Sequence, residues 1–131
     1  MEAKTELTLG QAVTLPEAQT TEDLARPDAE LYARFFRVLG DPTRLRILHL
    51  LLSAPPAGRT VSDLVEYLGQ PQGRVSTHLG CLRWCGLVAS ERSGKHVFYR
   101  LADPRVRDLL TLGGAVMRDH AAGVASCGVI R

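Results

Sequence analysis

The sequence predicts a mainly α-helical domain that carries a small β-hairpin. Apolar residues recur at helical spacing in several stretches that begin at capping residues, and most of these stretches end at a glycine. Two short runs of strand-forming residues, separated by a polar turn, follow the fourth stretch. At 131 residues the chain is long enough for one modest hydrophobic core and too short for two independent ones.

The first predicted helix follows an N-terminal arm. Residues 1–27 contain mostly Thr, Glu, Gln and Ala with two prolines and show little periodicity, so we expect a flexible arm. Asp28 can cap a helix that ends near Leu39, with Leu31 and Phe35 on its apolar face. This face is wider than a terminal helix can hide by itself, which predicts a partner chain against it.

Two more helices have clear start signals. Asp41 and the proline after it are typical of an N-cap and a first helical residue, and they open a helix over residues 43–53. Its predicted inward positions are Leu45, Leu48, Leu51 and Leu52. Thr60 and Asp63 fit a capping box, which opens a short helix that ends at Gly69.

Residues 70–86 form the stretch around which the predicted domain is organised. Pro71 suits the first turn of a helix, and Gly86 suits a left-handed stop after the last turn. One narrow apolar stripe runs along this helix through Val75, Leu79 and Leu82. Two short helices joined by a tight turn that contains glycine are the helix-turn-helix pattern, whose second helix enters the major groove of DNA.

The C-terminal third of the chain supplies the hairpin and the last helix. Residues 87–91 and 96–101 are predicted strands, joined by a basic turn over residues 92–95. A last helix is expected from Asp103 to about Ala122. The predicted organisation is therefore an arm (1–27), a DNA-binding and dimerisation domain (28–122) and a tail that contains one cysteine (123–131).

Charge is divided unevenly along the chain. The net charge is −3 over residues 1–40, +4 over residues 41–100 and +1 over residues 101–131, so the positive excess surrounds the helix-turn-helix. The sequence shows neither an apolar run of membrane-spanning length nor a secretory signal, and we expect a cytoplasmic protein without membrane contact. Three cysteines in such a compartment are expected to be thiols.

This order of elements resembles the ArsR/SmtB family of winged-helix, metal-responsive repressors. The resemblance covers residues 28–122 and rests on four segments, which are 39–48 (LGDPTRLRIL), 75–83 (VSTHLGCLR), 86–88 (GLV) and 99–101 (YRL). It implies a winged helix-turn-helix fold and a homodimer formed through the first and last long helices. It also implies binding to double-stranded operator DNA and release when an inducer binds.

The resemblance also suggests where the inducer binds. Residues 61–64 lack the Cys-x-Cys motif of one branch of the family, and the last helix lacks well-spaced Asp and His ligands. Residues 79–88 are instead similar to the cadmium/lead-sensing branch, and Cys127 lies where that branch places its third thiolate. A mercury-responsive member would need the same ligands.

Cys81 and Cys85 are one helical turn apart. Their Cβ atoms should be separated by about 5–6 Å, whereas a disulfide needs about 3.5–4.5 Å. Two thiolates can span that gap by binding one soft ion, and Cys127 would complete a trigonal all-sulfur site. The competing interpretation is that these cysteines are small packing residues. His78 shares the flank and is either an alternative ligand or a packing or capping residue.

Candidate DNA contacts lie near the start of the second helix of the motif and at the hairpin turn. They are Gln72, Arg74, Ser76 and Thr77, followed by Arg92 and Lys95. A solvated turn is the competing interpretation of the last two. Trp84 is expected to pack rather than to stack on a base, and Arg44 and Arg46 are expected to face solvent or phosphate.

The predicted function is a dimeric repressor that leaves its operator when cadmium, lead or mercury binds Cys81, Cys85 and Cys127, with no tightly bound cofactor. An arsenite-responsive repressor and a thiol-based redox sensor of the same fold are alternatives. An interaction module without an operator is a further one. An enzyme is not expected, because no motif places a nucleophile, a base and an oxyanion site together.

Overall fold

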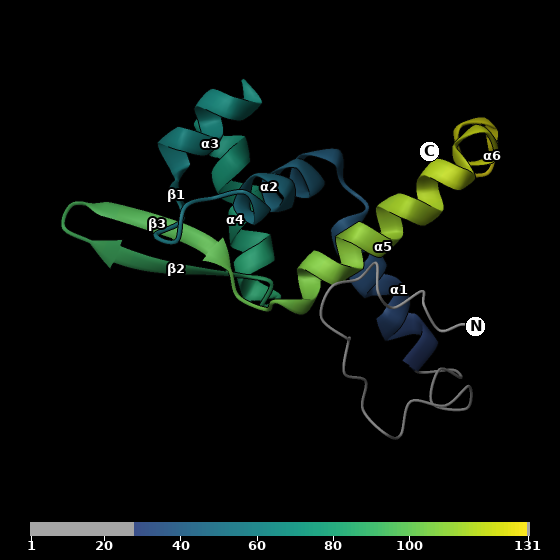
Figure 1. Cartoon of the computed structure of the whole chain (residues 1–131), viewed down its shortest axis with the longest axis horizontal. Helices are drawn as coiled ribbons and strands as arrows, with labels where there is room; N and C mark the ends of the chain where they lie inside the picture. Colours follow the sequence, from purple (N-terminus) through teal and green to yellow (C-terminus); the bar gives the residue numbers. More distant parts are fainter. Residues whose placement is uncertain (1–27, 131) are drawn as a thin grey trace. The chain divides into compact units, whose positions relative to one another are not determined.

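The computed structural model of the protein describes residues 28–130. In chain order the elements in Figure 1 are α1 (Asp28–Leu39), α2 (Pro42–Leu52), β1 (Arg59–Thr60), α3 (Val61–Leu68), α4 (Gln72–Trp84), β2 (Val88–Ser93), β3 (His96–Leu101), α5 (Arg105–Asp119) and α6 (Ala121–Ser126). The described residues fall into two compact parts, residues 28–103 and residues 104–130. Across residues 28–130 no helix has both the length and the apolar character needed to span a bilayer.

Two predicted helix starts, those of α2 and α3, are confirmed. Two others begin one position later than predicted, because Pro71 and Pro104 occupy the N-cap positions of α4 and α5 instead of the first helical turn. Asp41 Oδ1 accepts hydrogen bonds from the N–H groups of Thr43 (2.8 Å) and Arg44 (3.1 Å), which confirms it as the N-cap of α2. The predicted capping box of Thr60 and Asp63 is present at the start of α3. These local bonds satisfy N–H groups that the first turn of a helix leaves without intrahelical partners.

The core of residues 28–103 lies where α2, α3 and α4 meet the sheet. Its most buried side chains are Ile47, Leu48, Leu64, Val75, Leu79, Leu82 and Val88. The apolar stripe predicted for α4 is therefore confirmed. In α2 the prediction is partly wrong, because Leu45 and Leu52 are only half-buried whereas Ile47 is fully buried. The reason is that α2 contacts α1, α3, α4 and β3, so more than one face of it is covered.

The sheet is antiparallel with the strand order β1-β3-β2, and its hairpin extends away from the helices α2, α3 and α4 (Figure 1). The sequence did not predict β1, which pairs only Arg59 and Thr60 with β3. The connecting turn is also shorter than predicted, because Arg92 lies in β2 opposite Val97 and only Gly94 and Lys95 link the strands.

The last predicted helix is interrupted. α5 ends at Asp119, and His120 departs from helical geometry with φ −125° and ψ 20°. Its N–H donates to the carbonyl of Met117, three residues back, instead of continuing the four-residue pattern of the helix. A separate short helix, α6, follows and ends immediately before Cys127.

Candidate DNA-reading helix and thiol site

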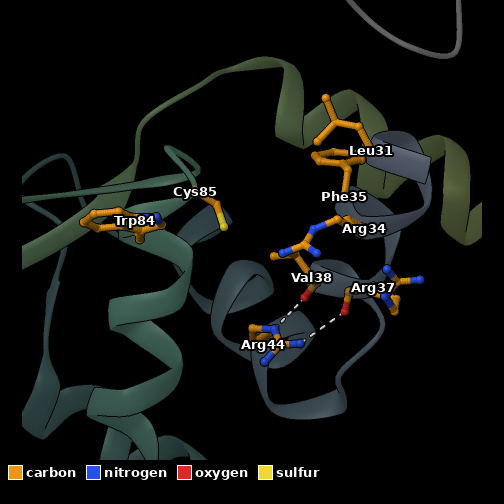
Figure 2. A pocket seen from close by; sticks show the side chains of 8 residues that line it. All are labelled: Leu31, Arg34, Phe35, Arg37, Val38, Arg44, Trp84 and Cys85. Atoms are coloured by element: carbon orange, nitrogen blue, oxygen red, sulfur yellow. Dashed lines mark hydrogen bonds between the residues drawn. The ribbon is translucent and has the colours of Figure 1, made fainter. Parts of the chain in front are cut away.

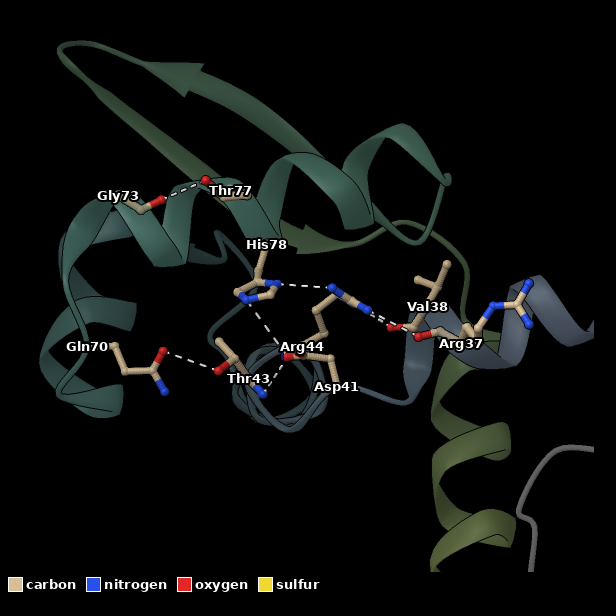
Figure 3. Close-up of polar contacts among 9 residues, drawn as sticks. All are labelled: Arg37, Val38, Asp41, Thr43, Arg44, Gln70, Gly73, Thr77 and His78. Carbon is tan, nitrogen blue, oxygen red and sulfur yellow. Dashed lines mark hydrogen bonds and ion pairs between the residues drawn. The ribbon is translucent and has the colours of Figure 1, made fainter. Parts of the chain in front are cut away.

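α3 and α4 are joined by a tight turn that is fixed at both ends. Gly69 ends α3 in the left-handed region with φ 64°, and Pro71 precedes the first residue of α4. Thr43 Oγ1 donates to Oε1 of Gln70 at 3.2 Å, which attaches the turn to the start of α2 (Figure 3). The turn therefore gives α4 a defined orientation against α2 and α3.

The predicted DNA-reading side chains lie on the exposed surface of α4. These exposed residues are Gln72, Arg74, Ser76 and Thr77. The Thr77 hydroxyl donates to the carbonyl of Gly73 at 2.9 Å (Figure 3), so its exposed oxygen can still accept a hydrogen bond. Because the opposite face of α4 is buried, the helix is half packed and half open to a partner.

The hairpin tip adds two exposed cations. Gly94 has φ 64°, which permits a two-residue loop with Lys95 at its second position. Arg92 and Lys95 are both exposed near this end of the hairpin. Further along the strands, Arg100 Nη1 pairs with Oε1 of Glu91 at 3.0 Å across the two strands.

The two thiols of α4 lie at its C-terminal end. Cys81 is partly buried and Cys85 is exposed, and both are free thiols. The N–H of Cys85 donates to the carbonyl of Cys81 at 3.0 Å, so the backbone between them is helical. Gly86 follows with φ 82°, and this lets the N–H of Leu87 reach the carbonyl of Leu82 at 3.0 Å and close the helix.

Cys81 and Cys85 lie one helical turn apart at the end of α4. Burial raises the pKa of the Cys85 thiol above its ordinary value, and the neighbouring Cys81 raises this pKa further through its charge and a hydrogen bond. Arg44 acts in the opposite direction. Two soft sulfur donors one helical turn apart, neither of them sealed in the core, are a donor set that fits a thiophilic ion.

The third predicted ligand, Cys127, is an exposed thiol at the C-terminal end of α6. It belongs to the part formed by residues 104–130, whereas Cys81 and Cys85 belong to the other part. Between residues 28 and 130 no three His, Cys, Asp or Glu side chains are grouped so as to hold a metal ion. The structure thus brings together two of the three predicted ligands.

Arg44 is a residue whose role sequence reasoning missed. It was expected to face solvent or phosphate, but its Nε donates to the carbonyl of Val38 and its Nη2 to that of Arg37, at the C-terminus of α1 (Figure 3). Its Nη1 lies 3.1 Å from Nδ1 of His78 on α4. A guanidinium can only donate, so Nδ1 of His78 is the acceptor and Nε2 carries the proton, 3.9 Å from Oδ1 of Asp41.

The structure also bears on the sequence-based expectations for His78 and Trp84. His78 packs and hydrogen-bonds between α4 and the start of α2, which agrees with its packing or capping role and leaves it outside a metal-binding group. The expectation that Trp84 packs is wrong for the described chain, since its side chain is 92% exposed. For Arg44, the sequence feature that could have indicated a role in joining helices is its position in the first turn of α2, directly after the end of α1.

Comparison with known proteins identifies the fold and family. The model of the bacterial regulatory protein family named arsR matches residues 41–90. A probable mercury resistance operon repressor of Streptomyces lividans is 46% identical over 95 residues, which cover 72% of this chain and 74% of that protein. The HTH-type transcriptional regulator CmtR of Mycobacterium tuberculosis is 46% identical over 54% of this chain and 58% of its own length.

A solved structure extends the comparison to the whole domain. The homodimeric winged helix-turn-helix DNA-binding domain of a possible ArsR-family regulator from Mycobacterium bovis superposes with a TM-score of 0.63 at 28% identity. The match covers 81% of this chain and 94% of that one. The predicted winged helix-turn-helix fold is confirmed, and these relatives are regulators rather than enzymes. The chain belongs to the ArsR family of bacterial transcriptional regulators.

Proposed function

We propose that this chain is a homodimeric repressor that binds operator DNA and releases it when a thiophilic heavy-metal ion binds Cys81, Cys85 and Cys127. The observation that supports this most directly is the placement of two free thiols one helical turn apart at the C-terminal end of α4. Cadmium, lead and mercury ions all suit an all-sulfur site. The name of the Streptomyces lividans relative favours mercury among them.

The proposed DNA contact uses the N-terminal half of α4 and the hairpin. Gln72, Arg74, Ser76 and Thr77 would enter the major groove, where side chains near the start of a reading helix contact base edges. Arg92 and Lys95 would contact phosphate or the minor groove beside it. The positive excess of residues 41–100 supports the same assignment.

The proposed dimer rests on exposed apolar side chains. On α1 these are Tyr32 and Phe36 (each 47% exposed), and on α5 they are Leu112, Val116 and Met117. Large apolar side chains gathered on one helix are a common sign of a protein interface. The Mycobacterium bovis relative, whose described form is homodimeric, supports this interpretation.

The chemistry of the site follows from its residues. Cys81 and Cys85 would each lose a proton and bind the ion, and Cys127 from the same or the partner subunit would supply a third thiolate. An ion bound by all three thiolates would link the end of α6 to the end of α4 and so change the orientation or mobility of the helix proposed to read DNA. Release requires that the ion bind the DNA-free form more tightly, by a coupling free energy of about 1–3 kcal/mol or more.

A titration tests the proposal. Operator DNA is first selected from random-sequence duplexes with the metal-free protein, and the complex is then titrated with Hg²⁺, Cd²⁺ or Pb²⁺. DNA release, by fluorescence anisotropy, and thiolate–metal absorption, in the ultraviolet, are followed in the same cuvette. We expect both signals to change at the same ion concentration for the wild-type protein.

The variant Cys85→Ser separates the two functions. It should bind the selected operator as the wild type does, because the exposed side chain of Cys85 packs little in the core, and it should no longer release DNA on metal addition. Full metal-induced release by Cys85→Ser would refute the thiol site. Release of the wild-type protein by peroxide, with none by any of the three ions, would instead identify a redox sensor.

A further inference from the structure

A cavity of about 670 Å³ lies between α1 and the C-terminal end of α4 (Figure 2). Its size is within the range of about 300–1,000 Å³ that is usual for small-molecule sites. The Cys85 side chain reaches this cavity from the end of α4, and α1 forms the facing wall. The lining residues are Leu31, Arg34, Phe35, Arg37, Val38, Arg44, Trp84 and Cys85.

The cavity carries positive charge, which is unusual beside a proposed ligand of a metal cation. Arg34, Arg37 and Arg44 line it, and none of the lining residues is a carboxylate. Arg44 hydrogen-bonds to carbonyls and to His78, and it interacts electrostatically with Asp41, a carboxylate that does not line the cavity. Arg34 and Arg37 are both exposed, and neither forms an ion pair within the described residues. A bare divalent ion would be repelled here, whereas an anion would be attracted.

The remaining lining is apolar. One face of α1 supplies three apolar side chains at helical spacing, Leu31, Phe35 and Val38. Trp84 lies beside Cys85 at the rim (Figure 2). Such a surface contacts the carbon skeleton of a small molecule, and the guanidinium groups beside it can bind carboxylates. The lining therefore selects a ligand that is organic, anionic and able to react with a thiol.

We infer that this cavity receives the thiophilic ion as an anionic complex with a small carboxylate-bearing thiol, and that Cys85 takes the ion from that complex. This inference rests on the proposed function of Cys85 as a ligand. Soft ions in a reducing compartment are held by thiolates, so a carrier thiol is the form in which they arrive. The step is a ligand exchange without redox change.

The exchange balances as follows. The Sγ atom of Cys85 forms a bond to the ion, one bond between the ion and a carrier sulfur breaks, and the proton of Cys85 leaves on the carrier thiol. Cys81, one helical turn before Cys85, is then in place to displace the second carrier thiol in the same way. The arginines hold the carrier carboxylates during the first exchange.

The test compares carriers that differ in charge. The metal-free full chain, without DNA, is mixed in a stopped-flow instrument with Hg²⁺ held by two molecules of glutathione, of 2-mercaptoethanol or of cysteamine. These complexes are anionic, neutral and cationic, respectively. The rate of thiolate–metal absorption is recorded for the wild type, for Arg34→Gln/Arg37→Gln, and for a control, Arg46→Gln/Arg118→Gln. The control removes the same charge from exposed positions that do not line the cavity.

At low salt we expect the cavity variant to take the ion from the glutathione complex about fivefold more slowly than the wild type, because it lacks the Coulomb attraction of two nearby cations. The effect should be smaller at high salt, which screens that attraction. Transfer from the 2-mercaptoethanol complex should not change, and the control should match the wild type. Equal slowing for the neutral carrier, no slowing for the anionic one, or equal slowing in the control would overturn the inference and leave the thiol site intact. Failure of the wild type to take the ion from any carrier would instead refute the proposed function.

Discussion

Replacing Arg44 by Met should destabilise the fold far more than the same change at Arg46, two residues along the same helix. Met has nearly the helix propensity of Arg and retains an apolar stem, so the substitution removes mainly the guanidinium. Arg44 makes three hydrogen bonds, two of them partly buried, to the end of α1 and to His78. Arg46 is exposed, and no such hydrogen bond is found for it within the described residues.

The expected magnitude follows from these bonds. A typical hydrogen bond contributes about 0.5–1.5 kcal/mol net, and the exposed one contributes little. Arg44→Met should therefore lower the free energy of unfolding by about 2 kcal/mol, and Arg46→Met by less than about 0.5 kcal/mol. Urea unfolding followed by circular dichroism, at one protein concentration for all variants, measures both values. Equal effects of the two substitutions would refute the role of Arg44 in joining α1, α2 and α4.

Three more predictions concern other positions. Gly58→Ala should cost about 3 kcal/mol or more in unfolding free energy, because φ is 97° and the added Cβ would lie 2.3 Å from the carbonyl oxygen of Tyr99. Gly69→Ala has φ 64° and open space and should cost only about 1 kcal/mol, so comparable losses would contradict the close approach at Gly58. Lys95→Ala should weaken operator binding and lower the slope of log Kd against log salt by about one, and an unchanged slope would remove Lys95 from the contact. For Asp41, burial opposes ionisation, but backbone hydrogen bonds and nearby cations outweigh it and hold its pKa below the ordinary value. Its charge then stabilises the fold above about pH 4 and ceases to do so as the pH falls through the lowered pKa. The difference in unfolding free energy between the wild type and Asp41→Asn should therefore disappear in acid. A difference that persists at about pH 2 would contradict this role of Asp41.

Local signals predicted the parts of the fold that local bonds determine. Asp41, the Thr60–Asp63 pair, Gly69 and Gly86 act on backbone groups within a few residues of themselves, and each has the predicted role. The exposed face of α4 and the one-turn spacing of its two thiols follow from helical geometry in the same way.

Contacts between distant segments were not predictable from these signals. β1 is two residues long and is a strand only because β3 lies beside it. The position of Arg44 directly after the end of α1 hints at its role, but its hydrogen bonds form only because α1 and His78 fold against the start of α2. The interruption at His120 has no proline or glycine to mark it. The ligand role of Cys127 stays a prediction for the same reason, since it too depends on contacts between distant segments.

The position of the thiols along α4 determines how release must work under the proposed function. From Arg74 to Cys85 the helix advances about 16 Å at 1.5 Å per residue, so metal and DNA occupy different ends of it. Both ligands can therefore be bound at once, and the ion acts by weakening an existing complex rather than by competing for its surface. The dissociation rate of DNA, measured after adding excess unlabelled operator, should then rise with metal concentration until it saturates. A dissociation rate independent of metal, with a lower apparent affinity, would mean that the ion captures only the free protein and that α4 does not transmit its binding to bound DNA.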